Sequence, residues 1–170
     1  MTAPKPIPDS LTKSQRTIRI LPVALLNAIN YLLIGLPLAV FPSLVHFKLG
    51  YSAALAGAII SLQYAATLVS RSLAGRISDT RGAKTIVICG LVFGALNGLC
   101  ILIASVCHTP LVILLWLGVS RLLLGIAESG TGTGCVTWNI GRVGSAATAE
   151  VISWNGVSSY GCLLYTSDAA

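Results

Sequence analysis

Two charged side chains, Arg121 and Glu128, interrupt an otherwise apolar run over residues 110–135. An arginine near the centre of a membrane span costs about 2.5–3.5 kcal/mol unless a partner or water meets its charge. The spacing of seven residues is close to two helical turns, so Arg121, Gly125 and Glu128 share one stripe of a helix. A rise of about 10.5 Å is too long for a direct ion pair between the two charges. We therefore expect each charge to meet another helix or an aqueous cavity. In the alternative, Arg121 snorkels or holds a buried ion pair and has only a structural role.

A second polar stripe lies in the first apolar run, where Asn27, Asn30 and Tyr31 follow one another at helical spacing. Gln63 and Asn97 are isolated polar residues in the second and third runs. Such side chains can line a solute path or hydrogen-bond between packed helices, and the spacing alone favours neither.

The composition places most of the chain in lipid. Of 170 residues, 55% are hydrophobic and only 9% are charged, against about 25% charged in soluble domains. The mean hydropathy is +0.85. No hydrolytic triad, metal-ligand cluster or cofactor motif is present, and the basic residues lack the aromatic interleaving of a nucleic-acid surface. These observations exclude a soluble enzyme and predict no enzyme activity, no cofactor, no metal and no nucleic-acid partner.

Four apolar runs and the start of a fifth are long enough to be membrane helices. We expect a polar tail over residues 1–19, followed by spans at about 20–45, 51–70, 85–106 and 110–135 and the beginning of a fifth from residue 151. In the third run Gly90, Gly94 and Gly98 recur at intervals of four, as at close helix interfaces. The glycines of residues 130–134 lack the lysine of a phosphate-binding loop, so we expect them to serve bending or packing.

The distribution of positive charge predicts the orientation. Nine Lys and Arg residues fall in the tail, after the second run and after the fourth run, whereas Lys48 alone falls in the opposite connections. By the positive-inside rule the N-terminus is then cytoplasmic, the first and third spans run outward, and the second and fourth run inward.

The connection after the second run combines glycine, acid and base in a way that a plain solvated turn does not explain. It reads GRISDTRGAKT from Gly75 to Thr85. Gly75 permits close approach of a helix end, and Gly82 permits a positive φ where the chain reverses. Asp79 can accept hydrogen bonds from a helix N-terminus or pair with a guanidinium, and three bases can bind carboxylates or anionic headgroups: Arg76, Arg81 and Lys84.

This segment resembles the G-x-L-a-D-r-x-G-r-k signature of the major facilitator superfamily, which also lies between the second and third helices. Gly75, Asp79, Gly82 and Lys84 agree with the signature, while Ala83 stands where a basic residue is common. The run from Arg121 to Glu128 is similar to the R-x-x-x-G pattern of the family's fourth helix. The resemblance implies that Gly75, Arg76, Asp79, Arg81, Gly82 and Lys84 form a cytoplasmic gating segment, and that Asn27, Tyr31, Arg121, Gly125 and Glu128 lie on a transport or coupling path.

On this resemblance the chain is an all-α membrane protein, the N-terminal part of a six-helix half. The implied function is secondary transport of a small solute across the bacterial inner membrane by alternating access, with proton-coupled efflux of the arabinose-efflux type. The implied partners are the solute, a proton or other coupling ion, membrane lipid and a C-terminal half beyond this fragment. Residues 162–170 resemble a translated sequencing adapter, so we expect the native part to end near Gly161. The alternative is a small four-helix membrane protein with a structural or assembly role.

Overall fold

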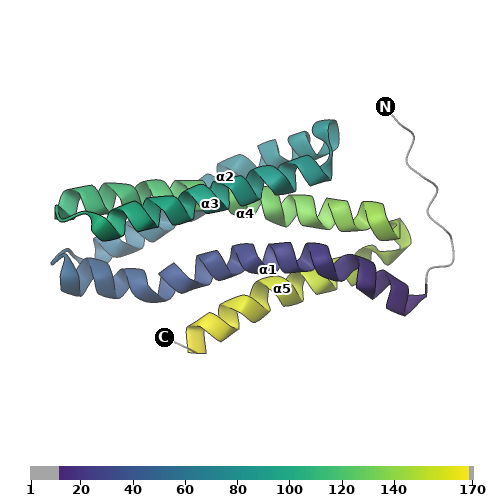
Figure 1. The fold of residues 1–170 in the computed structure, drawn as a ribbon, viewed down its shortest axis with the longest axis horizontal. Helices are drawn as coiled ribbons and strands as arrows, with labels where there is room; N and C mark the ends of the chain where they lie inside the picture. Colours follow the sequence, from purple (N-terminus) through teal and green to yellow (C-terminus); the bar gives the residue numbers. More distant parts are fainter. Residues whose placement is uncertain (1–11, 169–170) are drawn as a thin grey trace.

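The structure, a computed structural model, describes residues 12–168 as a bundle of long helices (Figure 1). The helices are α1 (Lys13–Ser43), α2 (Ala53–Arg81), α3 (Ala83–Val106), α4 (Pro110–Val143) and α5 (Thr148–Asp168), with a short π-helix (Leu44–Lys48) after α1 and a 3-10 turn (Ser145–Ala147) before α5. Within the described residues, four helical stretches are long and apolar enough to cross a membrane: Lys13–Lys48, Ala53–Arg81, Ala83–Val106 and Pro110–Val143. The expected all-α architecture and its four spans are therefore confirmed.

The helices extend beyond the apolar runs that predicted them. α1 begins at Lys13, so residues 13–19 of the expected polar tail are helical, and residues 1–11 lie outside the described residues. α2 continues to Arg81 and α4 to Val143. The loss of hydropathy marks where a helix leaves the hydrocarbon core, and the backbone hydrogen bonds continue past that point. α5 also runs without a break through residues 162–168.

Helix α4 is the centre of the bundle and packs most extensively on α3 and α2, whereas α5 packs mainly on α1. Figure 1 shows α1 and α5 along one side and α2, α3 and α4 along the other. The α3–α4 contact depends on glycine: a Cβ at Gly90 would lie 2.8 Å from the backbone nitrogen of Thr131, and one at Gly130 would lie 3.1 Å from the carbonyl oxygen of Ile86. Gly94 is buried beside Leu33 of α1, but a Cβ added at Gly98 would meet no described atom of another helix within 4 Å. The predicted glycine face is therefore correct for two of its three members, because a spacing of four drifts about 40° per step.

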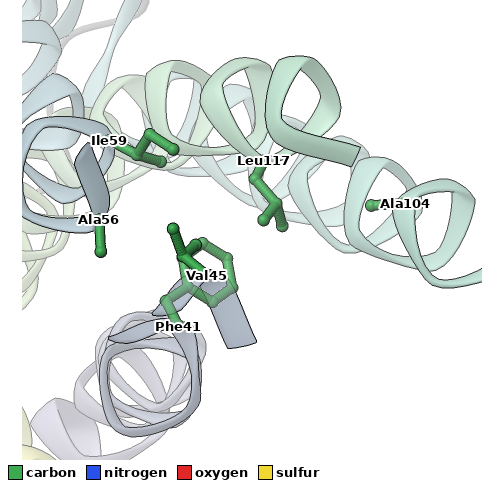
Figure 2. Packing of buried hydrophobic residues seen from close by; sticks show 6 residues of the cluster. All are labelled: Phe41, Val45, Ala56, Ile59, Ala104 and Leu117. Carbon is green, nitrogen blue, oxygen red and sulfur yellow. The ribbon is translucent and has the colours of Figure 1, made fainter. Parts of the chain in front are cut away.

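The C-terminal end of α1 changes helix type after its last proline. Pro42 lies one residue before the helix ends, and the chain then makes a single π-helical turn to Lys48. Phe41 and Val45 from this region pack against α2, α3 and α4 in a buried apolar cluster, which Figure 2 shows from close by. The other buried members are Ala56, Ile59, Ala104 and Leu117. The cluster fixes the position of the Phe41 ring relative to α4.

Candidate functional site

Arg121 is completely buried in the middle of α4. Its Nη1 donates a hydrogen bond of 3.1 Å to Oε1 of Gln63 on α2. Its guanidinium carbon lies 4.4 Å from the centroid of the Phe41 ring, which places the positive charge over the aromatic face. Nε and Nη2 of Arg121 have no hydrogen-bond partner among the described residues. The positive charge is thus stabilised by one amide and one aromatic ring, and the N–H groups on Nε and Nη2 remain able to donate hydrogen bonds.

Gln63 connects this arginine to Glu128. The side chain of Gln63 is 2% exposed, and its Nε2 donates a hydrogen bond of 3.2 Å to Oε2 of Glu128. An arginine can only donate hydrogen bonds, so the amide oxygen must face Arg121 and the amide nitrogen must face Glu128. The expectation that each charge meets a group from another helix is correct for both, and the same side chain serves both.

Glu128 receives both of its hydrogen bonds on one oxygen. Oγ1 of Thr67 lies 3.1 Å from Oε2 of Glu128. It also lies 2.9 Å and 3.3 Å from the carbonyl oxygens of Gln63 and Gly125, so its single proton goes to one of three acceptors at a time. Oε1 of Glu128 accepts no hydrogen bond from the described residues. Glu128 is only partly buried, which leaves this oxygen available to a ligand or a proton.

Gly125 brings α2 and α4 close enough for these contacts. A Cβ at this position would collide with the carbonyl oxygen of Gln63 and lie 2.8 Å from Cβ of Ala66 and 2.9 Å from the backbone nitrogen of Thr67. Two of these neighbours are backbone atoms and cannot move aside cheaply. The glycine on the predicted stripe therefore positions the hydrogen-bonded side chains.

A cavity of about 490 Å3 opens beside this chain of hydrogen bonds. Ten residues of α1, α2, α4 and α5 line it: Tyr31, Ile34, Gln63, Tyr64, Glu128, Ile152, Asn155, Gly156, Ser159 and Tyr160. Cavities of this size hold drug-sized molecules in other proteins. Of the predicted path residues, Tyr31 and Glu128 line the cavity, and Gln63 separates it from the buried Arg121.

The asparagines of the predicted polar stripe do not line this cavity. Nδ2 of Asn27 donates a hydrogen bond of 3.0 Å to Oγ of Ser159, which joins α1 to α5. Asn30 and Asn97 are buried, and their amide atoms have no partner among the residues that the structure describes. Asn27 thus makes an interhelical contact, as the packing alternative expects.

The segment from Gly75 to Lys84 is mostly helical, which corrects the expectation of a connecting loop. Gly75, Arg76, Asp79 and Arg81 belong to the last two turns of α2, and Lys84 is the second residue of α3. Gly82 alone makes the reversal, with φ of 93°, as predicted for this position.

The close approach expected at Gly75 is absent from the described part of the chain, since a Cβ there would meet nothing within 4 Å. Arg76, Asp79, Arg81 and Lys84 are all exposed. Within residues 12–168, no ion pair or side-chain hydrogen bond of Asp79 is present. The charged side chains of this segment therefore lie on the surface of the helix bundle.

Comparison with known proteins places the chain in a family. Residues 23–161 match the model of the Major Facilitator Superfamily. The chain belongs to the major facilitator superfamily. The resemblance of the 75–84 segment and of the fourth helix is thereby confirmed at the level of the family, and the chain is part of a multi-pass membrane protein.

Relatives from this superfamily match nearly the whole chain. The chain is 49% identical over 158 residues to an uncharacterized MFS-type transporter of Burkholderia pseudomallei (strain 1106a), covering 92% of this chain and 39% of that protein. It is 45% identical over 161 residues to an uncharacterized MFS-type transporter of Pseudomonas aeruginosa (strain LESB58), covering 94% of this chain and 40% of that protein. The chain thus spans about two fifths of the length of these relatives. No solved structure matches it significantly.

Several residues of the site gave no distinct signal in the sequence. Phe41, Thr67 and Tyr64 are ordinary residues of apolar helices, and their roles depend on how α1 and α2 are rotated against α4. Asn155 and Ser159 of α5 are likewise ordinary residues, and they line the cavity because of how α5 is rotated. In this member of the major facilitator superfamily, the sequence held one general signal: a glutamine in a lipid-crossing run needs a polar partner, although the sequence does not show which one.

Proposed function

We propose that this chain forms part of a secondary transporter that moves a small solute across the bacterial inner membrane by alternating access. The observation that carries the proposal is the continuous contact from buried Arg121 through Gln63 to Glu128 at the wall of the 490 Å3 cavity. Buried ionisable side chains that are linked by hydrogen bonds beside a cavity of this size are typical of solute and proton pathways in membrane proteins. Membership of the superfamily supports the same function.

The geometry suggests how a proton is coupled to the movement of α2 and α4. Oε2 of Glu128 accepts from Gln63 and Thr67, so an incoming proton binds Oε1. The protonated carboxyl is neutral, and hydrogen bonds to neutral acceptors are weaker than those to carboxylates. Protonation therefore weakens the link between Glu128 and α2 and leaves the Gln63 amide held by Arg121 alone. In this proposal proton binding loosens one helix interface, and the coupled solute movement is efflux.

The charged end of α2 acts as the cytoplasmic gate in this proposal. Asp79, Arg76, Arg81 and Lys84 are exposed and unpaired within the described residues, so they are free to bind another part of the complete protein in one state only. The N-terminus and this segment are cytoplasmic, in accordance with the excess of basic residues on that side.

The test uses cysteine labelling in the complete protein, with its native cysteines replaced. A single cysteine replaces Tyr64 at the cavity wall, and a membrane-impermeant maleimide is added to right-side-out and inside-out vesicles with and without a pH gradient. We expect labelling from both sides, with a ratio that shifts when the gradient is applied. The Arg121→Ala change should abolish that shift.

Two control positions fix the orientation. Ala54 and Thr80 are exposed near opposite ends of α2. A cysteine at position 54 should label only from outside and one at position 80 only from inside. Labelling of position 64 from one side alone under all conditions would contradict alternating access, and reversed labelling of the controls would contradict the orientation.

A further inference from the structure

We infer that the solute taken by this cavity is an organic cation with an aromatic or other bulky apolar body. The inference rests on the proposed transport function and deepens it by naming the substrate class. It follows from the charge, the hydrogen-bonding state and the aromatic side chains of the cavity wall.

Among the described residues that line the cavity, Glu128 is the only charged one. Its Oε2 is taken by Gln63 and Thr67, while Oε1 has no partner among the described residues. A carboxylate oxygen with free lone pairs at a cavity wall attracts a cation or a hydrogen-bond donor. The wall therefore offers one negative charge and one vacant acceptor.

No cationic side chain of the described residues lies in the wall to accept an anion. Arg121 is fully buried, with its guanidinium between the Gln63 amide and the Phe41 ring. Arg71 is exposed on α2, eight residues beyond Gln63, and does not line the cavity. In the described part of the wall, an anionic solute would thus meet the Glu128 carboxylate with no cationic side chain beside it. Arg121 lies behind Gln63, and Arg71, whose charge acts on Tyr31, lies outside the lining.

Three of the described residues that line the cavity are tyrosines: Tyr31, Tyr64 and Tyr160. Tyr64 is 56% exposed and Tyr160 is 70% exposed, so both rings have accessible area. The face of a tyrosine ring attracts a cation within about 6 Å and also covers apolar surface of a ligand. Ile34 and Ile152 add apolar area, and the described lining residues include no second carboxylate that would favour a dication.

The test compares two ions of nearly identical shape and opposite charge in the purified complete protein. Tetraphenylphosphonium and tetraphenylborate are titrated separately against the protein in nanodiscs, with empty nanodiscs as the blank. We expect saturable binding of tetraphenylphosphonium at a concentration at least about tenfold below that needed for tetraphenylborate. Equal or tighter binding of tetraphenylborate would overturn the inference.

Variants locate the binding site. Glu128→Gln should weaken tetraphenylphosphonium binding about tenfold. The matched change Glu150→Gln should leave it unaltered, since Glu150 does not line this cavity and, among the described residues, its carboxylate accepts a hydrogen bond from Thr17. If Glu128→Gln does not fold, Tyr64→Leu serves instead, because the Tyr64 side chain makes no hydrogen bond and its loss should weaken binding about two- to fivefold. Unchanged affinity in the folded variant would overturn the inference.

The labelling assay separates this inference from the transport proposal. Alternating labelling at position 64 together with a preference for tetraphenylborate would reject the cation and keep transport. Selective cation binding that depends on Glu128, without alternating labelling, would keep the cation site and reject transport.

Discussion

The α2–α4 contact around Gly125 and the C-terminal end of α2 around Gly75 contain the same residue types in opposite surroundings. Both have a glycine, an arginine and an acid within a short stretch of helix. At Gly125 the neighbouring helix fills the space where a side chain would be, and Arg121 is completely buried. At Gly75 that space is empty, and Asp79 is exposed.

A pattern of glycine and charged residues therefore has no fixed meaning in a membrane helix. Where helices close over it, the glycine sets the distance between backbones and the charges need partners from the same bundle. Where it stays open, the charges are solvated and contribute little to folding. The two regions should therefore respond differently to the same substitution.

The largest expected effect comes from the matched pair Gly125→Ala and Gly75→Ala. The added methyl group at position 125 meets the backbone of Gln63 and Thr67, so we expect a loss of about 3 kcal/mol in the free energy of unfolding. At position 75 alanine meets nothing, and its better helix propensity should add up to about 1 kcal/mol. Unfolding of the complete protein in mixed micelles measures both, and equal losses would remove the distinction between the two regions.

The next effect concerns Gln63→Leu, which keeps the size of the side chain and removes the amide. Arg121 then loses its one hydrogen-bond partner, and Glu128 loses one of two donors. We expect a loss of about 1.5–3 kcal/mol in the free energy of unfolding, because both lost bonds involve charged groups. Gln15→Leu is the control at an exposed helix start, where water replaces the amide and the loss should be smaller. Similar losses in both variants would contradict a buried bridge.

A smaller effect is expected for Phe41→Leu, which retains apolar volume and removes the ring over Arg121. A desolvated cation–π contact is worth about 2 kcal/mol, so the variant should lose roughly that amount in the free energy of unfolding. Phe47→Leu is the matched control, since Phe47 is 81% exposed. Phe41→Tyr, which keeps a ring, should recover most of the loss; failure to do so would show that packing alone matters at this position.

The smallest effect on stability is expected for Asp79→Asn. The side chain is exposed and unpaired within the described residues, so the free energy of unfolding should change by less than about 0.5 kcal/mol. If the C-terminal end of α2 is the gate, the balance between inward and outward labelling at position 64 should still shift. An unaltered balance between inward and outward labelling would contradict a role of this region as a gate and leave it only a role in membrane orientation.

The sequence predicted the coarse features of this molecule because they depend on hydropathy and spacing. Apolar runs predicted the helices, and the seven-residue spacing of Arg121 and Glu128 predicted that neither pairs with the other. The reversal at Gly82 was also predicted, since a positive φ favours glycine.

What escaped prediction depends on rotation and register between helices. Gln63 was a minor candidate because nothing in one helix shows which residue of another it will meet. Gly75 and Gly98 were expected at close helix contacts, yet a Cβ added at either position would meet no described atom within 4 Å. A small residue permits a close contact between helices without causing it. The helices end beyond the predicted spans for a related reason: charge ends a lipid-crossing run without ending a helix.

The most direct test of the central claim, that Gln63 couples Arg121 to Glu128, is a double-mutant cycle of Arg121→Gln and Glu128→Gln in the complete protein. The cycle is measured by reversible unfolding, first with Gln63 present and then in the Gln63→Leu background. We expect a coupling free energy of at least about 1 kcal/mol with Gln63 present and less than about 0.5 kcal/mol without it. Equal coupling in both backgrounds would contradict the claim.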